Sequence, residues 1–355
     1  MKILLLGEFS AFHQNLKEAL VELGHDVTIA SMGDGWKQID RDIDLNLKNK
    51  FFHNKVTDRI YPWFDLKKLY GYDIVQLINP FLFYRKYFPN KLYLEKIIKN
   101  NKKFFIVAAG SDAYFWKYGK ERLNYGPFND FKKYDKKVKH FYLESKRNLL
   151  FNQKIVEMSN GVIPIMYEYE ISYIHDSKRL PTIPIPMNLK KIHYEENIVK
   201  DKLVVFHGLN RYGFKGTRFV EEAFSILSKK YPNELELIID GHMPLDKYLQ
   251  IMRKTNVIID QTNSYSLGVN GIYALAMGKV VLGGAEPESL VSLGILDSPV
   301  INVLPNTQSI VTSIEKLLAK KNEITKIGYQ SRKFVEKNHN NIDIAKLYLK
   351  TWSDN

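Results

Sequence analysis

The chain has 355 residues, 45% hydrophobic and 26% charged, a composition that suits two ordinary globular domains and excludes disorder over most of its length. It has no cysteine, which excludes disulfides, thiolate metal sites and a cysteine nucleophile. Lys and Arg number 52 against 39 Asp and Glu, a net charge of +13, and the nine histidines show no metal-binding spacing.

The first half of the chain alternates short apolar runs with stretches of helical periodicity. Residues Lys2–Leu6 form a continuous apolar run, as parallel strands do when both faces are covered. A helix is predicted over about Ala11–Leu23, ending before Gly24. Further strands are predicted at Asp26–Ala30, Asp73–Ile78, Lys103–Ala108 and Gly161–Pro164, and further helices at Lys91–Lys99 and Phe131–Leu149. Asn129 or Asp130 is the expected cap of the last helix.

The second half repeats this alternation after a polar stretch at 191–200, which predicts a linker. Its strands are predicted at Lys202–Phe206, Leu235–Ile239, Val257–Ile259, Lys279–Leu282 and Val300–Val303, and its helices at Phe219–Lys230, Leu245–Lys254, Gly271–Met277, Ser309–Ala319 and Lys326–Leu349. This order predicts an α/β fold of two facing Rossmann-like domains, residues 1–190 and 201–355, each a doubly wound parallel sheet. The amphipathic final helices can cover either domain, and the last can cross back to the first.

The first strand-to-helix turn, Gly7–His13, lacks the second and third glycines of the GxGxxG fingerprint. This argues against an NAD-dependent enzyme. Gly7 permits a ligand to approach the backbone closely, and the helix that follows presents its amino terminus to an anion. The alternative is that Gly7 serves only the geometry of the turn.

The loop that follows the first strand of the second domain carries two cations. Gly208 and Gly213 have the spacing of a P-loop, but Phe214 stands where a P-loop requires lysine, which excludes an NTPase of that type. Arg211 and Lys215 remain, and together they suit a diphosphate. The alternative is that both are solvated surface cations.

The segment Asn263–Lys279 predicts a loop, a short alanine-containing helix and a stop at Gly278. The unpaired amides of Gly268, Val269 and Asn270 would form a second site for an anion at the amino terminus of this helix. Because both segments follow strands of one parallel sheet, we expect them to meet at a single diphosphate group.

These segments resemble a GT-B glycosyltransferase, nearest to the retaining family 4 type (glycosyl transferases group 1). The resemblance is carried by the loop ending in Lys215-Gly216, the strand end Asp260-Gln261, the segment from Tyr265 to Lys279 and the run Phe334–His339. It is strong over about 200–350 and rests mostly on pattern over 1–190. The sequence departs from the family at its E-x7-E motif, where Tyr265 and Tyr273 replace both acids.

The resemblance implies that the second domain binds the donor and that the first domain contacts the acceptor. The residues expected to bind the donor are Gly208, Arg211, Lys215, Asp240, Gly268, Val269, Asn270, Tyr273 and Glu288, with Glu288 as a partial replacement for the missing acid. The residues expected to contact the acceptor are Gly7, Phe9, His13, Ser111 and Asp112. Asp112, Arg211 and Lys215 are the expected catalytic residues, although Asp112 would serve equally well as a helix cap.

The resemblance further implies transfer of a hexose from a nucleoside diphosphate sugar to a glycan or lipid-linked acceptor, with retention of configuration. Such an enzyme would act in the synthesis of surface polysaccharides or glycoconjugates, and we expect it to need no metal or other cofactor. One alternative is an inactive, glycosyltransferase-like binding or scaffold protein, because both family acids are missing.

The excess positive charge is concentrated between Arg85 and Arg147, where 17 Lys and Arg stand against 6 Asp and Glu, interleaved with aromatic residues. This pattern suits an anionic membrane surface, or single-stranded nucleic acid by stacking, or a solvated face. No apolar run reaches the roughly 18–20 residues of a membrane-spanning helix, and no secretion signal is recognisable. We expect a cytoplasmic protein that can bind peripherally to the inner face of the membrane and has no nucleic-acid partner.

Overall fold

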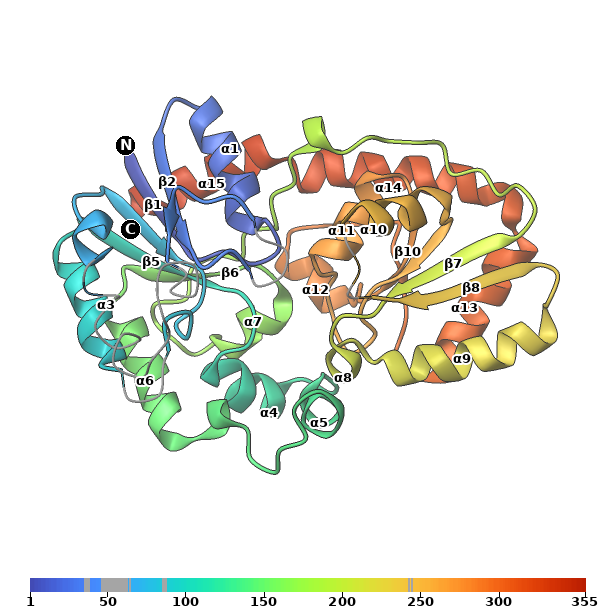
Figure 1. The fold of residues 1–355 in the computed structure, drawn as a ribbon, viewed down its shortest axis with the longest axis horizontal. Helices are drawn as coiled ribbons and strands as arrows, with labels where there is room; N and C mark the ends of the chain where they lie inside the picture. The colour runs from blue at the N-terminus through green and yellow to red at the C-terminus, as the bar shows by residue number, and fades with distance from the viewer. Residues whose placement is uncertain (35–38, 46–62, 64, 85–87, 242, 244) are drawn as a thin grey trace. The chain divides into compact units, whose positions relative to one another are not determined.

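The computed structural model describes residues 1–34, 39–45, 63, 65–84, 88–241, 243 and 245–355 (Figure 1). Its contacts divide the chain into two compact units. The first unit comprises Met1–Gly119, Tyr142–Asn188 and Asn341–Asn355, and the second comprises Lys120–Phe141 and Leu189–Asn340. The predicted first domain contains Lys120–Phe141 by position, whereas the contacts of this segment are with the second unit.

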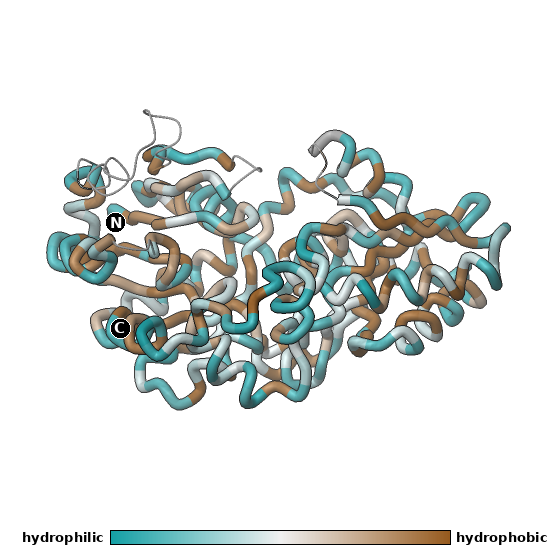
Figure 2. The backbone as a smooth tube through the Cα atoms, turned by 60° about the horizontal axis from the view of Figure 1, so that its bottom comes forward, coloured by the Kyte–Doolittle hydropathy of each residue, from teal (hydrophilic) through white to brown (hydrophobic). Residues whose placement is uncertain are grey.

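The first unit is built on a parallel sheet of six strands in the order β3-β2-β1-β4-β5-β6. The strands are β1 (Lys2–Leu6), β2 (Asp26–Ser31), β3 (Ile43–Asp44), β4 (Ile74–Leu77), β5 (Lys103–Ala108) and β6 (Gly161–Pro164). Residues Ile3–Leu6 have no exposed surface, which explains why β1 is apolar at every one of these positions. Sheet strands are among the brown, hydrophobic stretches of the chain in Figure 2.

Helices α1 (Phe12–Glu22), α3 (Asn90–Lys99), α6 (Lys146–Glu157), α7 (Tyr167–Ser172) and α15 (Asn341–Asp354) complete the first unit. Helix α15 packs against α1, with the rings of Tyr348 and Phe12 edge to face at 6.4 Å. Lys103 donates a hydrogen bond to the carbonyl of Trp352 (2.9 Å). The prediction that the last helix crosses back to the first half is confirmed.

The predicted helix Lys326–Leu349 is wrong as a single element. The structure has α14 (Ile324–Asn338), which belongs to the second unit, and α15, which belongs to the first. The start of α15 is tied to the first unit, because the Asn341 amide donates to Met187 and its side chain donates to the carbonyl of Asn15. These tertiary contacts end a periodicity that the sequence continues.

The second unit is built on a parallel sheet of five strands in the order β11-β10-β9-β7-β8. The strands are β7 (Leu203–Gly208), β8 (Leu235–Asp240), β9 (Val257–Ile259), β10 (Val280–Gly283) and β11 (Ile301–Asn302). The helices include α8 (Tyr212–Lys215), α9 (Thr217–Lys230), α10 (Leu245–Lys254), α11 (Val269–Ala276), α12 (Pro287–Ser292) and α13 (Thr307–Ala319). The two parallel α/β sheets confirm the predicted fold class.

The predicted helix Phe131–Leu149 does not form. Instead, α5 (Phe128–Asp130) leads into the π-helical turn η5 (Phe131–Lys136), which ends where Lys137 is left-handed (φ 50°). A 3₁₀ turn, η6 (Tyr142–Glu144), and α6 follow, and α6 is capped by Ser145. The carboxylate of Asp130 pairs with Arg218 instead of capping a helix.

Within the described part of the chain, no helix combines the length and the hydropathy needed to cross a bilayer.

Candidate functional site

The candidate site lies at the carboxyl ends of β7 and β9, where the strand order of the second sheet reverses. His207 in β7 pairs in register with Ile259 in β9, so the loops that follow these two strands start side by side. Doubly wound sheets bind their ligands at such a switch point. The Gly208–Lys215 loop follows β7, and Asp260 directly follows β9.

The ammonium group of Lys215 is buried at this point, with 7% of the residue exposed. Its Nζ lies 3.4 Å from Oδ1 of Asp260, which is itself 2% exposed. A charge-assisted hydrogen bond is normally about 2.7–2.9 Å, and an ammonium has three donors. Among the residues that the structure describes, Asp260 is the one polar partner of the Lys215 ammonium. Donors of a buried cation are therefore available to an anion.

Asp260 connects Lys215 to the start of α11. Its Oδ2 accepts a hydrogen bond from the amide of Gly268, the residue that caps this helix (2.9 Å). A Cβ at Gly271 would lie 2.8 Å from the same oxygen, so glycine is needed there. The amides of Val269 and Asn270 have no acceptor among the described residues. The structure thus brings Lys215 and the amino terminus of α11 together, as predicted from the strand order.

His207 lies near Lys215 and Asp260 but carries no charge. Its Nδ1 donates to the carbonyl of Ile259 (2.9 Å), which leaves Nε2 to accept from the Thr217 hydroxyl (2.9 Å). Burial and the charge of Lys215 lower the pKa of His207 to about 4. The positive charge at the switch point therefore comes from Lys215.

Arg211 is held differently from Lys215. Its guanidinium lies over the ring of Phe214, 3.8 Å from the ring centroid. The residue is exposed, whereas Lys215 points into the protein. Of the two predicted donor cations, Lys215 contacts Asp260, whereas the guanidinium of Arg211 lies on Phe214 of its own loop.

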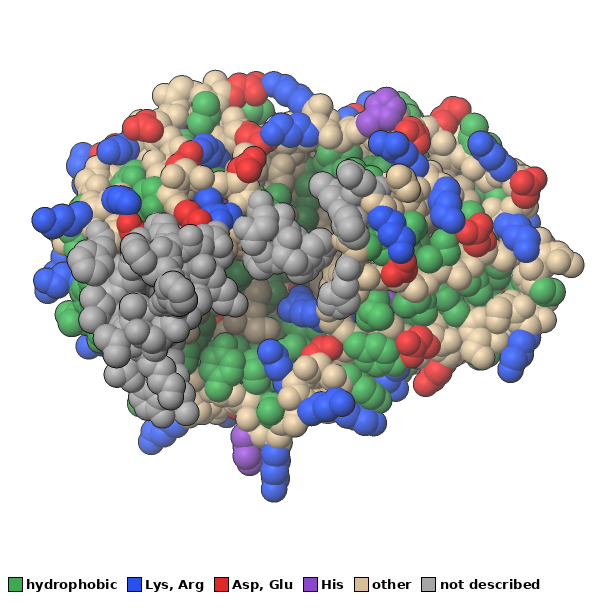
Figure 3. All heavy atoms as spheres, in the orientation of Figure 1, with side chains coloured by type: hydrophobic (Ala, Val, Ile, Leu, Met, Phe, Trp, Pro, Cys, Tyr) green, Lys and Arg blue, Asp and Glu red, His purple; other side chains and the backbone are tan. Residues whose placement is uncertain are grey.

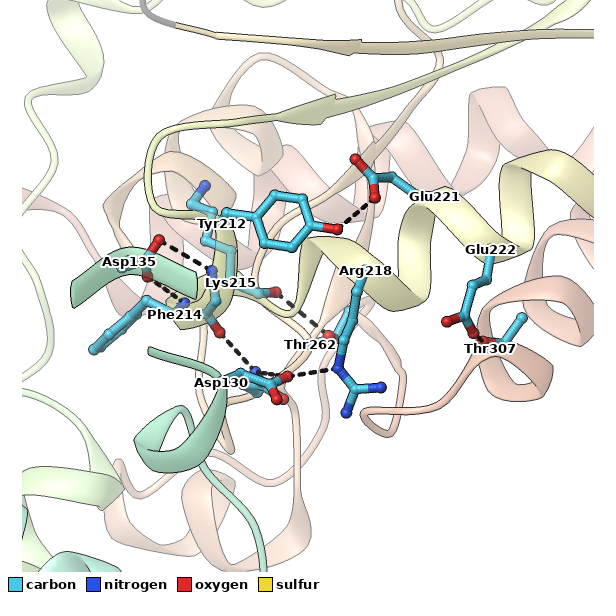
Figure 4. Close-up of polar contacts among 12 residues, drawn as sticks. Asp130, Asp135, Tyr212, Phe214, Lys215, Arg218, Glu221, Glu222, Thr262 and Thr307 are labelled. Atoms are coloured by element: carbon cyan, nitrogen blue, oxygen red, sulfur yellow. Dashed lines mark hydrogen bonds and ion pairs between the residues drawn. The ribbon is translucent and has the colours of Figure 1, made fainter. Parts of the chain in front are cut away.

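The segment Lys120–Phe141 packs on the α8 loop of the same unit (Figure 4). The Asp135 carboxylate accepts from the amides of Gly213 (3.1 Å) and Phe214 (2.9 Å), and Asp130 pairs with the Nε of Arg218 (2.8 Å). A Cβ at Gly213 would lie 2.2 Å from the carbonyl oxygen of Asp130, so the approach requires glycine. Asp135 thus holds two amides of the glycine-rich loop that the sequence offers to a ligand.

Tyr265, at the first family-acid position, is part of this packing. Its ring stacks on Tyr125 at 4.5 Å and 19°, and its hydroxyl accepts from the amide of Asn124 (3.1 Å). Tyr273, at the second position, lies half-buried in α11. Burial raises the pKa of both tyrosine hydroxyls, so both remain neutral.

Two acids, Asp240 and Glu288, are predicted to bind the donor, and their surroundings differ. Asp240 ends β8, opposite Gly208, and its pKa is lowered by the hydrogen bond from the Gly241 amide and by Lys247. Glu288 is exposed on α12. The acid bound beside Tyr265 is instead Glu286, which accepts from the hydroxyl of Tyr125 (2.8 Å).

In the first unit, the residues predicted to contact an acceptor lie near the switch point between β1 and β4. Gly7 has φ +93°, a conformation that favours glycine, and a Cβ there would lie 2.4 Å from the side chain of Leu82, which would have to move. A Cβ at Gly110 would lie 3.1 Å from the ring of Phe9. Asn79 donates to the carbonyls of Ala109 (2.8 Å) and Ser111 (3.3 Å). Phe9 and the 109–111 turn are therefore neighbours.

His13 and Asp112 are fully buried. His13 donates from Nδ1 to the carbonyl of Gly7 (2.7 Å), and burial lowers its pKa to about 4. Asp112 accepts from the Phe115 amide (2.8 Å) and the Tyr173 hydroxyl (2.7 Å), and burial raises its pKa to about 6. These surroundings favour the capping role of Asp112 over a catalytic one, and they do not support contact of His13 with a substrate.

Glu8 was not singled out from the sequence, yet its carboxyl group is buried at the end of β1. Its oxygens accept from the amides of His13 (3.3 Å) and Gln14 (2.8 Å), at the start of α1. Burial raises the pKa of Glu8 to about 7, and nearby Asp34 acts in the same direction. An apolar strand followed by a single acid is the sequence signal that marks this residue.

Replacing Glu8 by glutamine is expected to flatten the pH dependence of stability. The folded chain keeps the Glu8 proton up to a pH of about 7, whereas the ordinary value is 4.5. Between pH 4.5 and about pH 7 the folded state binds more protons than the unfolded state does. The free energy of unfolding therefore falls as pH rises. Relative to wild type, Glu8→Gln should gain up to about 3 kcal/mol between pH 4 and pH 8.

Urea unfolding at several pH values measures this difference. Glu157→Gln, on the exposed face of α6, is the control and should run parallel to wild type. A constant difference between Glu8→Gln and wild type across the range would contradict the assignment.

No group of three or more His, Cys, Asp or Glu in the described ranges is arranged to hold a metal ion.

Comparison with known proteins identifies the fold. No protein-family model and no curated protein sequence matches the chain. Its structure is similar to sucrose-phosphate synthase from Thermosynechococcus elongatus (TM-score 0.66, 15% identity) and to HepE from Anabaena in complex with UDP-glucose (0.64, 11%), each alignment covering 100% of both chains. It is also similar to UDP-GlcNAc 2-epimerase from Neisseria meningitidis bound to UDP-GlcNAc (0.52, 15%, 100% of both chains).

The chain therefore has the GT-B fold, as predicted. The fold is shared by a sucrose-phosphate synthase, a glycosyltransferase from Rickettsia africae and an epimerase, so the reaction has to be argued from the site.

Proposed function

We propose that the protein transfers a hexose from a nucleoside diphosphate sugar to a glycan or lipid-linked acceptor, with retention of the anomeric configuration. One observation carries the proposal. The buried ammonium of Lys215, whose one polar contact among the described residues is 3.4 Å, is joined through Asp260 to the amino terminus of α11 at the switch point of the second sheet. A buried cation beside open helix amides suits the diphosphate of such a donor.

The chemistry of transfer explains why positive charge is needed there. As the bond between the sugar C1 and the leaving oxygen breaks, negative charge develops on the diphosphate. Lys215 and the amides of Val269 and Asn270 are fixed before the reaction, so they stabilise this charge with little rearrangement. Arg211 adds a second cation from the same loop. We propose that these groups act without a metal ion or another cofactor.

The ligands of similar structures support the donor class. HepE was solved with UDP-glucose, and the Neisseria epimerase with UDP-GlcNAc. We infer that a UDP-sugar is the first donor to test. A role in surface polysaccharide or glycoconjugate synthesis follows from the proposed acceptor.

The second candidate is a binding or scaffold protein without activity, and a specific observation favours it. Tyr265 replaces an acid of the family motif and is fixed by Tyr125 and Asn124, so it offers no carboxylate. Tyr273 retains a neutral hydroxyl that can donate to a ribose oxygen.

A thermal-shift screen across nucleoside diphosphates and their sugars, followed by product analysis, tests the proposal. A stabilising donor should lose its sugar to an added glycan or lipid-linked acceptor. Nucleotide binding without turnover would favour the scaffold, and conversion of UDP-GlcNAc to its 2-epimer would identify an epimerase. If no nucleotide or nucleotide sugar raises the melting temperature, the transferase proposal is contradicted and the scaffold is favoured.

Replacing Tyr273 by phenylalanine is expected to weaken binding of the nucleoside diphosphate about fivefold, because the variant loses one hydrogen bond of about 1 kcal/mol. Calorimetric titration measures the affinity. Tyr329→Phe, on the exposed face of α14, is the control and should bind as wild type does. Equal affinity for Tyr273→Phe and wild type would remove Tyr273 from the site.

A further inference from the structure

The basic segment of the sequence contains a loop in which four lysines are exposed. Residues 132–140, which we call the lysine loop, run between the buried rings of Phe131 and Phe141. The exposed residues of the loop are Lys133, Lys136, Lys137, Val138, Lys139 and His140. In Figure 1 it is the green-blue loop between α5 and α6, and Figure 3 shows Lys or Arg and one histidine projecting at the same edge.

The base of the lysine loop is fixed by ring packing and by hydrogen bonds to the backbone. The rings of Phe131 and Phe141 are edge to face at 5.3 Å, and Tyr134 packs on Tyr212 at 5.2 Å. Asp135 binds the amides of Gly213 and Phe214. The Val138 amide donates to the carbonyl of Lys132 (3.2 Å), which closes the tip.

The acids in and next to the lysine loop are already bound to other groups. Asp135, the acid within the loop, accepts from backbone amides, and the nearby Asp130 pairs with Arg218. Lys133 lies over the ring of Tyr134 (4.9 Å). For Lys137 and Lys139, the described part of the chain provides no ion pair. A partner that neutralises these lysines must come from outside.

The surroundings of the aromatic residues at the lysine loop distinguish between two polyanions, single-stranded nucleic acid and an anionic bilayer. Single-stranded nucleic acid needs exposed ring faces on which bases stack. Here Phe131 and Phe141 are buried, Tyr134 packs on Tyr212, and Tyr142, which is 50% exposed, stacks on Tyr84 at 5.9 Å. The tip therefore offers lysines around Val138, which is 40% exposed. Cations surrounding one apolar side chain suit a bilayer, where lysines meet anionic headgroups and the apolar group enters the interface.

We propose that the lysine loop binds the surface of an anionic lipid bilayer. This goes beyond sugar transfer and does not depend on it. Arg85 and Lys86, at the start of the basic segment, lie outside the described residues and are not part of the argument. Each lysine near such a surface strengthens binding roughly fivefold at low salt.

Vesicle sedimentation tests the proposal with the full chain. Wild type should bind phosphatidylcholine vesicles containing 30% phosphatidylglycerol, should not bind pure phosphatidylcholine, and should be released at 0.5 M salt. Lys137→Glu/Lys139→Glu should lower the partition coefficient by at least about 25-fold. Lys326→Glu/Lys337→Glu, on the exposed face of α14, changes the net charge equally and should bind nearly as wild type does.

Thermal unfolding and nucleotide titration of both double variants show whether each is folded, independently of lipid binding. Equal loss of binding in the two folded variants would overturn the proposal, because net charge alone would then explain it. Equal binding to pure phosphatidylcholine would overturn it as well. Preference of the wild type for a single-stranded oligonucleotide over anionic vesicles would do the same.

Discussion

Replacing Lys215 by methionine is expected to lower kcat/KM for the nucleoside diphosphate sugar by about 100-fold or more, the usual effect of removing one group that stabilises developing charge. Methionine keeps the length of the side chain but not the ammonium, which lies 3.4 Å from Asp260 at the end of β9. Steady-state kinetics over a range of donor concentrations measures the loss. Lys215→Arg keeps the charge and should retain more activity than Lys215→Met.

The control for this variant is Lys254→Met, because Lys254 also belongs to an ion pair of the second unit. Its pair with Glu236 spans 3.0 Å, and both side chains are largely exposed. Lys254→Met should retain wild-type kinetics. If Lys215→Met is folded and turns over donor at the wild-type rate, Lys215 does not stabilise the leaving group.

Replacing Asp260 by asparagine is expected to lower the free energy of unfolding of the ligand-free protein by about 3 kcal/mol, because Lys215 then remains buried without a counter-ion. For a domain of this size, the melting temperature should fall by roughly 6–12 °C. The asparagine oxygen can still accept from the Gly268 amide, so the change tests the charge and not the hydrogen bond.

A nucleoside diphosphate should stabilise Asp260→Asn more than wild type, because its phosphates supply the missing negative charge beside Lys215. Glu236→Gln breaks an exposed pair and should change stability by less than about 1 kcal/mol. An Asp260→Asn variant as stable as wild type, or one that gains no more from the nucleotide, would contradict this account of the site.

The sequence predicts the sheets well because each strand is a local apolar run. Lys2–Leu6, Lys103–Ala108, Gly161–Pro164 and Val257–Ile259 match β1, β5, β6 and β9 residue for residue, and the other strands of the second sheet shift by one or two residues. The helix predictions are wrong where tertiary contacts override the hydrophobic periodicity of the sequence. Phe131–Leu149 breaks at Lys137, and Lys326–Leu349 divides at the junction between the two units.

From the sequence, only those residues of the site that follow neighbouring strands can be predicted to lie together. Lys215 and Gly268 follow neighbouring strands, so their meeting follows from the topology. Asp135 binds amides 78 and 79 residues away, a partnership that local sequence does not encode. The burial of His13 and Asp112 is likewise a property of the packed first unit and not of their spacing.

The most direct test is a calorimetric comparison of uridine diphosphate with uridine on wild type and Lys215→Met. If Lys215 and the amides of Val269 and Asn270 hold the diphosphate, wild type should bind the diphosphate at least about tenfold more tightly than the nucleoside, a difference of 1.4 kcal/mol. Lys215→Met should lose most of this preference. Equal affinity of wild type for the two ligands, or a preference that survives in the variant, would contradict the central claim.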